Sequence, residues 1–232
     1  RNYKFNAIQH GGQHTIVRKN LFTGNRGGGV AYQFYDDESR YVYGNRLYNN
    51  TFTKNRCGAI IGQSGSRKYM YDNIALNNLV YANEDCSGGG RQISIASRRA
   101  VQLVKNLVAA DNPGIVLGRD GALCPTVGSR VVDTAAFATR TREAGAGHVI
   151  PVDDASWFSD GYGIVSGDLI QLAGGSDKYR VVEIAETADT IRIDRPAGWA
   201  KGDGIHLAFA GDGPDQGAFE FNGPRCANGA DN

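Results

Sequence analysis

Net charge is nearly absent from this chain, because 25 Lys and Arg residues face 24 Asp and Glu residues and leave a formal net charge of +1. This balance provides no bulk field that would attract nucleic acid or an anionic membrane surface. Long apolar runs are missing as well, since none approaches the ~18 residues of a membrane-spanning helix. We therefore expect neither nucleic acid as a partner nor a membrane span.

Several motifs of catalysis and nucleotide binding are also missing. The chain has no Gly-x-Ser-x-Gly elbow, no phosphate-binding P-loop and no dinucleotide fingerprint, which disfavours Ser-triad hydrolysis and nucleotide chemistry. It holds one Met and begins at Arg1, inside what reads as an incomplete repeat at residues 5–8. We therefore expect a processed or truncated chain that lacks its earlier repeats and any signal peptide.

The sequence is rich in glycine, with 32 of 232 residues, about twice the usual share, and it contains a fourfold repeat. The motif Asn-x-apolar-x-x-Asn/Asp begins at Asn20, Asn50, Asn78 and Asn106, at spacings of 30, 28 and 28 residues. Short β-branched and aromatic runs between Gly and Asn predict strands and turns. Residues 1–120 show no apolar stripe of helical period. A period in this range predicts stacked repeats.

The repeat has a recognisable family pattern. Asn-x-Phe-x-x-Asn at residues 50–55, followed by Gly-x-Ile at residues 58–60, resembles the right-handed parallel β-helix superfamily, which includes pectate lyases, polygalacturonases and alginate lyases. The resemblance covers residues 14–121. It implies an all-β fold with three short strands per coil, and it says little about chemistry. We expect the Asn side chains to bond the backbone at bends and to stack from coil to coil.

The second half of the chain follows a different pattern. Alternating runs at residues 148–152, 168–172, 179–184, 190–193 and 204–207 predict five short strands in a small antiparallel barrel or sandwich. Residues 131–221 resemble a module of secreted bacterial β-helix proteins, most clearly in Val-Asp-Asp-Ala near residue 152 and Pro-Asp-Gln-Gly-Ala-Phe-Glu near residue 214. This resemblance implies a module without a known enzymatic role, after which the chain returns to finish or cap the coils.

Three regions are thus expected along the chain. Residues 1–139 form β-helix coils that are incomplete at the N-terminus. Residues 140–210 form the inserted β-rich module. Residues 211–232 form a return strand or cap and a tail, because an open end of stacked coils would leave core residues and strand edges exposed.

The four cysteines allow three pairings. Cys57 and Cys86 occupy nearly the same corner of consecutive repeats, and coils stack at about 4.8 Å, within reach of a disulfide. Cys124 and Cys226 would then pair by elimination. The alternative, four buried or free thiols, stays open. Disulfides would imply an extracellular or periplasmic location.

A row of basic residues is the first candidate site. Arg40, Lys68 and Arg99 each precede the third apolar segment of a repeat, with Arg67 and Arg98 beside them and Tyr41 and Tyr69 after them. Cations beside stacked aromatic rings suit a uronic-acid polymer, and the resemblance implies lyases in which Arg or Lys takes the C5 proton while Ca²⁺ or another Arg neutralises the carboxylate. The alternative is that the charges are solvated and the tyrosines pack on one another.

Acidic and His residues give weaker candidates. The run Asp36, Asp37 and Glu38 could hold Ca²⁺ or supply acid and base groups, although a polar loop explains it as well. His10 and His14 lack a third and a fourth metal ligand nearby, and we expect a turn there. For six acids of the module we expect turn roles before a structural Ca²⁺: Asp153, Asp154, Asp160, Asp168, Asp203 and Asp212.

Two functions remain open from the sequence. The first is a secreted, carbohydrate-associated protein that binds an acidic polysaccharide or cell-surface glycan, or cleaves it as a lyase rather than as a hydrolase. The second is a non-enzymatic extracellular structural, adhesion or assembly subunit that uses the β-helix as a rigid scaffold, alone or in an oligomer. Whether the chain is an enzyme is not decided by its residues.

Overall fold

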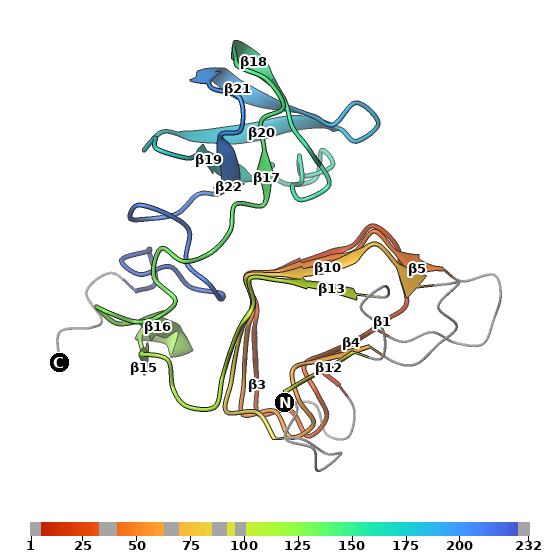
Figure 1. The fold of residues 1–232 in the computed structure, drawn as a ribbon, viewed down its shortest axis with the longest axis vertical. Helices are drawn as coiled ribbons and strands as arrows, with labels where there is room; N and C mark the ends of the chain where they lie inside the picture. The colour runs from red at the N-terminus through yellow and green to blue at the C-terminus, as the bar shows by residue number, and fades with distance from the viewer. Residues whose placement is uncertain (1–5, 33–40, 63–69, 85–91, 96–100, 227–232) are drawn as a thin grey trace. The chain divides into compact units, whose positions relative to one another are not determined.

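The computed structural model describes residues 6–32, 41–62, 70–84, 92–95 and 101–226. Two compact units are formed by Arg1–Thr134 with Asp215–Asn232, here the repeat unit, and by Ala135–Pro214, here the module. Both are built from β-strands (Figure 1), and helical structure in the described ranges is limited to a 3-10 turn at Arg119–Gly121. None of the helical residues described is part of a helix that could span a membrane. The all-β prediction is confirmed.

Three parallel sheets make up most of the repeat unit, and each receives one strand from each of four successive repeats. Sheet A contains β1 (Ile8–His10), β4 (Val30–Tyr32), β8 (Ile60–Gly62) and β12 (Ile93–Ile95). Sheet B contains β2 (Ile16–Arg18), β6 (Arg46–Tyr48), β10 (Asn73–Leu76) and β13 (Val101–Val104). Sheet C contains β3 (Leu21–Thr23), β7 (Thr51–Thr53), β11 (Leu79–Tyr81) and β14 (Leu107–Ala109). A fourth, two-stranded parallel sheet, sheet D, pairs β5 (Val42–Tyr43) with β9 (Met70–Tyr71).

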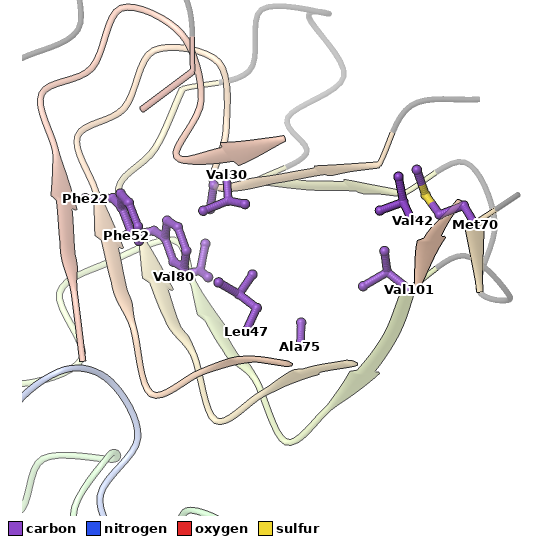
Figure 2. Close-up of a cluster of buried hydrophobic side chains, with 10 residues drawn as sticks. Phe22, Val30, Val42, Leu47, Phe52, Met70, Ala75, Val80 and Val101 are labelled. Atoms are coloured by element: carbon purple, nitrogen blue, oxygen red, sulfur yellow. The ribbon is translucent and has the colours of Figure 1, made fainter. Parts of the chain in front are cut away.

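The core between the sheets is a set of apolar columns. In sheet C, Phe22 stacks on Phe52 with ring centroids 4.7 Å apart, and Val80 occupies the same position in the next repeat. The other buried side chains of this core are Val30, Val42, Leu47, Ala59, Met70, Ala75 and Val101. Figure 2 shows the labelled members of this cluster pointing into the space that the sheets surround. Equivalent positions of successive repeats therefore pack on one another, as the spacing of the motif predicts.

The corner between sheets B and C requires a residue in the left-handed backbone conformation, which few residue types adopt readily. The residue before each repeat Asn is in the left-handed region, with φ from 49° to 55°, namely Lys19, Asn49, Asn77 and Lys105. This conformation costs a residue with a Cβ about 1 kcal/mol or more. Each of these corners is followed by an Asn whose side chain bonds to a neighbouring repeat, and these bonds offset the cost.

The repeat Asn residues form the ladder that the sequence predicts, here the first Asn ladder. The Oδ1 of Asn50 accepts the backbone N–H and the Nδ2 of Asn20, both at 3.1 Å. The Oδ1 of Asn78 accepts the same two groups of Asn50 at 3.0 Å, and Asn106 does so for Asn78 at 2.9 and 2.8 Å. Asn50 and Asn78 are fully buried. Their polar groups are thus satisfied by equivalent residues of the neighbouring repeats.

A second Asn ladder runs along the corner after sheet C. Asn25 donates from Nδ2 to Asn55 at 2.7 Å, and Asn55 donates to Asn83 at 2.8 Å. At the last step Gln92 supplies the acceptor, because its Oε1 takes the N–H and the Nδ2 of Asn83 at 3.1 Å. The fourth repeat has Asp111 where the motif would place the next Asn, so the longer Gln side chain from another part of the repeat continues the ladder.

A hairpin covers the outer face of sheet C. It joins β15 (Ile115–Leu117) to β16 (Leu123–Pro125), and Ile115 packs on Leu79, Tyr81 and Ala109. The predicted disulfide between Cys124 and Cys226 is confirmed, with Cα atoms 5.5 Å apart. It ties this hairpin to the C-terminal part of the chain. Cys57 is disulfide-bonded as well, but its predicted partner Cys86 lies outside the described residues.

Residues 215–221, here the return segment, form bends and turns rather than a strand. The segment lies along the corner between sheets B and C, where it binds groups of all four left-handed corner residues. Gly217 N donates to Asn77 O at 2.9 Å, and Gln216 Nε2 donates to Lys105 O at 2.6 Å. Asn49 Nδ2 donates to the carbonyl of Asp215 at 2.7 Å, and Lys19 pairs with Glu220 at 2.6 Å. The segment therefore fastens four repeats from the side.

The module is one curled antiparallel sheet of six strands. In spatial order these are β17 (Thr139–Arg140), β22 (Gly204–Leu207), β19 (Leu169–Leu172), β20 (Lys178–Ala185), β21 (Thr190–Trp199) and β18 (Gly145–Pro151). The edge strands are β17 and β18. The residues that follow them, Thr141 and Val152, form an antiparallel β-bridge. The five strands predicted from alternation are found, and the two-residue β17 was too short to produce a pattern. The largest fully buried side chains of the module are Ile150, Ile170, Ile191, Ile193 and Ile205.

Candidate functional site

Most residues of the predicted basic row lie outside the described residues. This holds for Arg40, Arg67, Lys68, Tyr69, Arg98 and Arg99, and also for the acidic run Asp36, Asp37 and Glu38. Tyr41 is described, and it leads directly into β5 of sheet D. The described part of the candidate site therefore consists of the side chains around sheet D.

Four aromatic side chains lie together there, here the aromatic row. Tyr43 and Tyr71 are register partners of β5 and β9, and their rings stack 4.9 Å apart at an interplanar angle of 10°. Tyr41 approaches Tyr71 edge-on at 6.5 Å, and His14 approaches Tyr43 edge-on at 4.9 Å. Tyr71 is 39% exposed, so the row reaches solvent.

The backbone at the corner before sheet B holds the row in place. His14 and Asp72 are left-handed at this corner, with φ of 49° and 50°, and Gly44 has φ of 67°. A Cβ on Gly44 would lie 2.9 Å from the Nδ1 of His14. The close approach of the His14 ring therefore requires a glycine here, which the sequence pattern alone does not indicate.

The corner before sheet B also contains a third ladder of hydrogen-bonded side chains, which was not predicted from the sequence. The Nε2 of His10 lies 3.0 Å from the Oδ1 of Asn45, and Asn45 Nδ2 donates to Asn73 Oδ1 at 2.7 Å. His10 thus takes the place of a ladder Asn in the first repeat. The predicted turn role holds for His14, which has left-handed backbone at the corner, whereas His10 ends strand β1 and its side chain joins the ladder. The signal in the sequence was the 28-residue spacing of Asn45 and Asn73.

The charged side chains described near the row are paired. The guanidinium of Arg46 donates to the carbonyl of Asp72 at 2.9 Å and lies 3.6 Å from its carboxylate. Arg46 is buried, whereas Asp72 is exposed. This ion pair fixes the corner, and its cation is not displayed to solvent for a ligand.

The strand register bears on the predicted basic row. Val42 pairs with Met70 and Asn73 pairs with Val101, 28 residues apart in both cases. Arg40 and Lys68 have the same 28-residue spacing and stand two residues before Val42 and Met70. Lys68 and Arg99 are 31 residues apart, which departs from this register. In the sequence, Arg40 and Lys68 therefore stand at the same distance from two register partners, Val42 and Met70.

The described residues were next compared with what a metal site requires. Within the described part of the chain, no three His, Cys, Asp or Glu side chains gather as a metal site would require. Of the module acids expected in turns, Asp160 and Asp203 bond the backbone of their own turns, whereas Asp168 joins two segments nine residues apart. The Oδ1 of Asp160 accepts Tyr162 N at 2.9 Å, Asp168 Oδ2 accepts Ser159 N at 2.7 Å, and Asp203 Oδ2 accepts Ala200 N at 2.8 Å.

A cavity of about 500 Å³ opens in the module between the turn at residues 173–177 and residues 209–212. The buried Gln171 joins its two walls, since Nε2 donates to Gly175 O at 2.8 Å and Oε1 accepts Phe209 N at 3.2 Å. Lys178 and Asp212 stand at its border with opposite charges. The amide of Gln171 is used within the module, so it is not free to bind a ligand.

One carboxyl group of the return segment is strongly perturbed. Asp215 is fully buried, and its Oδ1 accepts the N–H of Asp133 at 2.7 Å while its Oδ2 accepts that of Phe221 at 2.5 Å. Burial raises the pKa of Asp215 to about 7, because the two N–H donors offset only part of the loss of solvation. The group fastens the points where the chain leaves and re-enters the repeat unit, and its role here is structural.

Comparisons with known proteins add no relative. No protein-family model matches the chain, and searches of curated proteins and of solved structures found no match.

Proposed function

We propose that the chain is a secreted, right-handed parallel β-helix protein that binds an acidic polysaccharide along sheet D. The observation that carries the proposal is the aromatic row, together with the equal spacing of two basic residues that precede its strands in the sequence. Tyr41, Tyr43 and Tyr71 reach the surface from successive repeats, and Arg40 and Lys68 stand at matching positions next to them in the sequence. Cations repeated at the spacing of the coils suit a polymer that carries a carboxylate on each sugar.

The geometry favours binding over cleavage. Among the described residues, no group of three or more His, Cys, Asp and Glu side chains gathers beside the row, and Arg46 is engaged by Asp72. Because Tyr43 and Tyr71 cover one another, the row offers ring edges and part of one ring rather than two open faces. We therefore assign contact with sugar hydroxyls to Tyr41 and Tyr71, and charge pairing with the polymer to Arg40 and Lys68.

A rigid scaffold is the second candidate, and the ladders favour it. Buried Asn residues saturate one another in three rows, and the return segment binds all four repeats. Such an arrangement suits a rod in a structural or adhesive assembly. The Cys124–Cys226 disulfide supports an extracellular setting for either function.

The test is binding of polygalacturonate and alginate, compared with a neutral glucan, by calorimetry at low and high salt. We expect the acidic polymers to bind with an affinity that falls as salt rises, and the variant Arg40→Gln with Lys68→Gln to lose most of it. The matched control replaces two exposed cations elsewhere, Arg119→Gln with Lys201→Gln. Equal loss in the control would reduce the effect to net charge.

Cleavage is measured in the same samples through the ultraviolet absorbance of the unsaturated uronate that β-elimination creates. We expect binding without this signal. A signal that disappears in the Arg40 and Lys68 variant would make the protein a lyase. Absence of binding to either polymer would leave the scaffold as the function.

A further inference from the structure

The fourth repeat has no described strand beside it on one side. Its strands β12, β13 and β14 are each the last strand of a parallel sheet, so within the described ranges one edge of each is unpaired. Leu103 of β13 and Val108 of β14 are register partners of Ala75 and Val80, which are fully buried in the core. Leu103 and Val108 are nevertheless 48% and 49% exposed. These strand edges and the two exposed side chains are here called the open end.

The open end lacks the features that normally keep strand edges apart. Free edges of natural sheets are protected by charged side chains that point inward, by proline or by bulges. Residues 101–104 and 107–109, which form β13 and β14, include no proline and no charged residue. Their pairing with β10 and β11 is regular, without a bulge. Apolar core positions beside unpaired backbone therefore suit a partner that adds further strands.

The backbone of β14 directs the polar groups of its central residue to the free edge. The N–H of Leu107 donates to the carbonyl of Asn78 at 2.9 Å, so Leu107 faces the third repeat. Successive residues of a strand direct these groups to opposite sides, so those of Val108 face away from that repeat. The first repeat agrees, because the carbonyl of Phe22, at the same position, accepts Asn55 Nδ2 of the following repeat at 3.0 Å. Val108 can therefore pair with another strand.

Two charged residues stand at equal distances from Val108. Lys105 precedes it by three residues, and Asp111 follows it by three. Both side chains are exposed, and neither forms an ion pair within the described chain. Antiparallel pairing of β14 with the β14 of a second copy, centred on Val108, places Lys105 of each copy opposite Asp111 of the other. The open end is therefore complementary to itself in charge.

We propose that the open end binds the open end of a second copy of this chain in a symmetric dimer. The two copies of Val108 exchange N–H···O bonds across the two-fold axis, and Lys105 and Asp111 of opposite copies form two ion pairs. A two-fold axis through sheet C also brings β13 of each copy against β12 of the other, which covers Leu103. The inference does not rest on polysaccharide binding, because the aromatic row takes no part in it.

The test is the mass of the protein in solution, measured by sedimentation from micromolar to millimolar concentration. We expect a reversible dimer. Val108→Asp places a charge at the centre of the contact and should leave a monomer. The matched control is Val182→Asp, which makes the same change at an exposed strand residue of the module and should dimerise as the native protein does. The melting temperatures of both variants check that each is folded.

Exchanging the two charges tests the register of the contact. Lys105→Glu and Asp111→Lys each place like charges opposite one another, and each should weaken the dimer roughly tenfold because two ion pairs are lost. Both changes in one chain should restore the native affinity. Mixing the two single variants should restore it as well, since each supplies the charge that the other lacks. High salt should reduce these differences.

Amide hydrogen exchange locates the contact on the strand. The N–H of Val108 should become protected as the dimer forms. A protein that stays monomeric at millimolar concentration would overturn the proposal and leave the open end to a different protein. A dimer that survives Val108→Asp would overturn it too, as would charge variants that neither weaken the dimer nor rescue one another.

Discussion

The repeat unit and the module bury different kinds of side chain in their interiors. The repeat unit buries Asn side chains, of which Asn50 and Asn78 are fully enclosed, whereas the largest fully buried side chains of the module are isoleucines such as Ile191. In stacked parallel repeats, each position lies over its own copy, so one amide can satisfy the next. In an antiparallel sheet no position repeats in this way, and apolar packing remains. The pattern of the sequence decides which of the two is available.

Breaking the first Asn ladder in its middle should have the largest effect. Asn50→Leu removes the acceptor of two donors of Asn20 and the donor to the carbonyls of Val17 and Tyr48. Each buried polar group left unpaired costs ~1–3 kcal/mol, and we expect about 4 kcal/mol off the free energy of unfolding. Urea denaturation followed by far-ultraviolet circular dichroism measures it. A loss below that of an exposed-site variant would contradict the role of the ladder.

A cavity in the module core should cost somewhat less. Ile191→Ala, at a fully buried position, is expected to lower the stability of the module by about 3 kcal/mol. Both tryptophans of the chain, Trp157 and Trp199, lie in the module, so tryptophan fluorescence reports this unit alone. Ile191→Ala should shift the fluorescence transition, while Asn50→Leu should leave it in place. The exposed Val182→Ala serves as control and should change neither.

The end of the second Asn ladder should be less sensitive than the middle of the first. Gln92→Leu removes the acceptor of Asn83 N and Asn83 Nδ2 and the donor to Ala109 O. Gln92 is half-buried, so water can replace part of these bonds, and we expect about 2 kcal/mol. Gln92→Glu, which keeps the acceptor, should cost less than Gln92→Leu in the same denaturation. The reverse order would show that the amide donor matters more than the acceptor.

The last expected effect is a dependence of the folding stability on pH. Because burial raises the pKa of Asp215 to about 7 from an ordinary 3.8, the folded protein holds a proton that the unfolded chain releases. The stabilisation is complete below the unfolded pKa and is lost as pH rises toward about 7. Asp215→Asn should flatten this fall in the free energy of unfolding, with the exposed Asp212→Asn as control for the lost charge. An unchanged slope in Asp215→Asn would assign the pH dependence to other groups.

The sequence predicted the features that repeat and missed those that do not. The Asn20 and Asn25 motifs gave the ladders and the parallel strands, because equal spacing places equal residues over one another. The part taken by His10, the substitution of Gln92 for a ladder Asn, and the lateral path of the return segment depend on contacts between distant residues. No local pattern records such contacts. The Cys124–Cys226 pairing followed by elimination rather than from any spacing.

The candidate sites divide in the same way. The stacking of Tyr43 on Tyr71 follows from their register, whereas the cavity on the outer face of sheet C was not predicted. Its wall comes from Leu117 and Leu123, which a separate hairpin brings onto sheet C. Thr23, Thr53 and Tyr81 read as ordinary strand residues until that hairpin is in place.

The most direct test of the proposed function is a crystal structure of the protein with a short oligogalacturonate. The account predicts right-handed coils with the oligosaccharide lying along sheet D, its carboxylates beside Arg40 and Lys68 and its hydroxyls near Tyr41 and Tyr71. Coils of the opposite hand, or an oligosaccharide bound only away from the aromatic row, would contradict it.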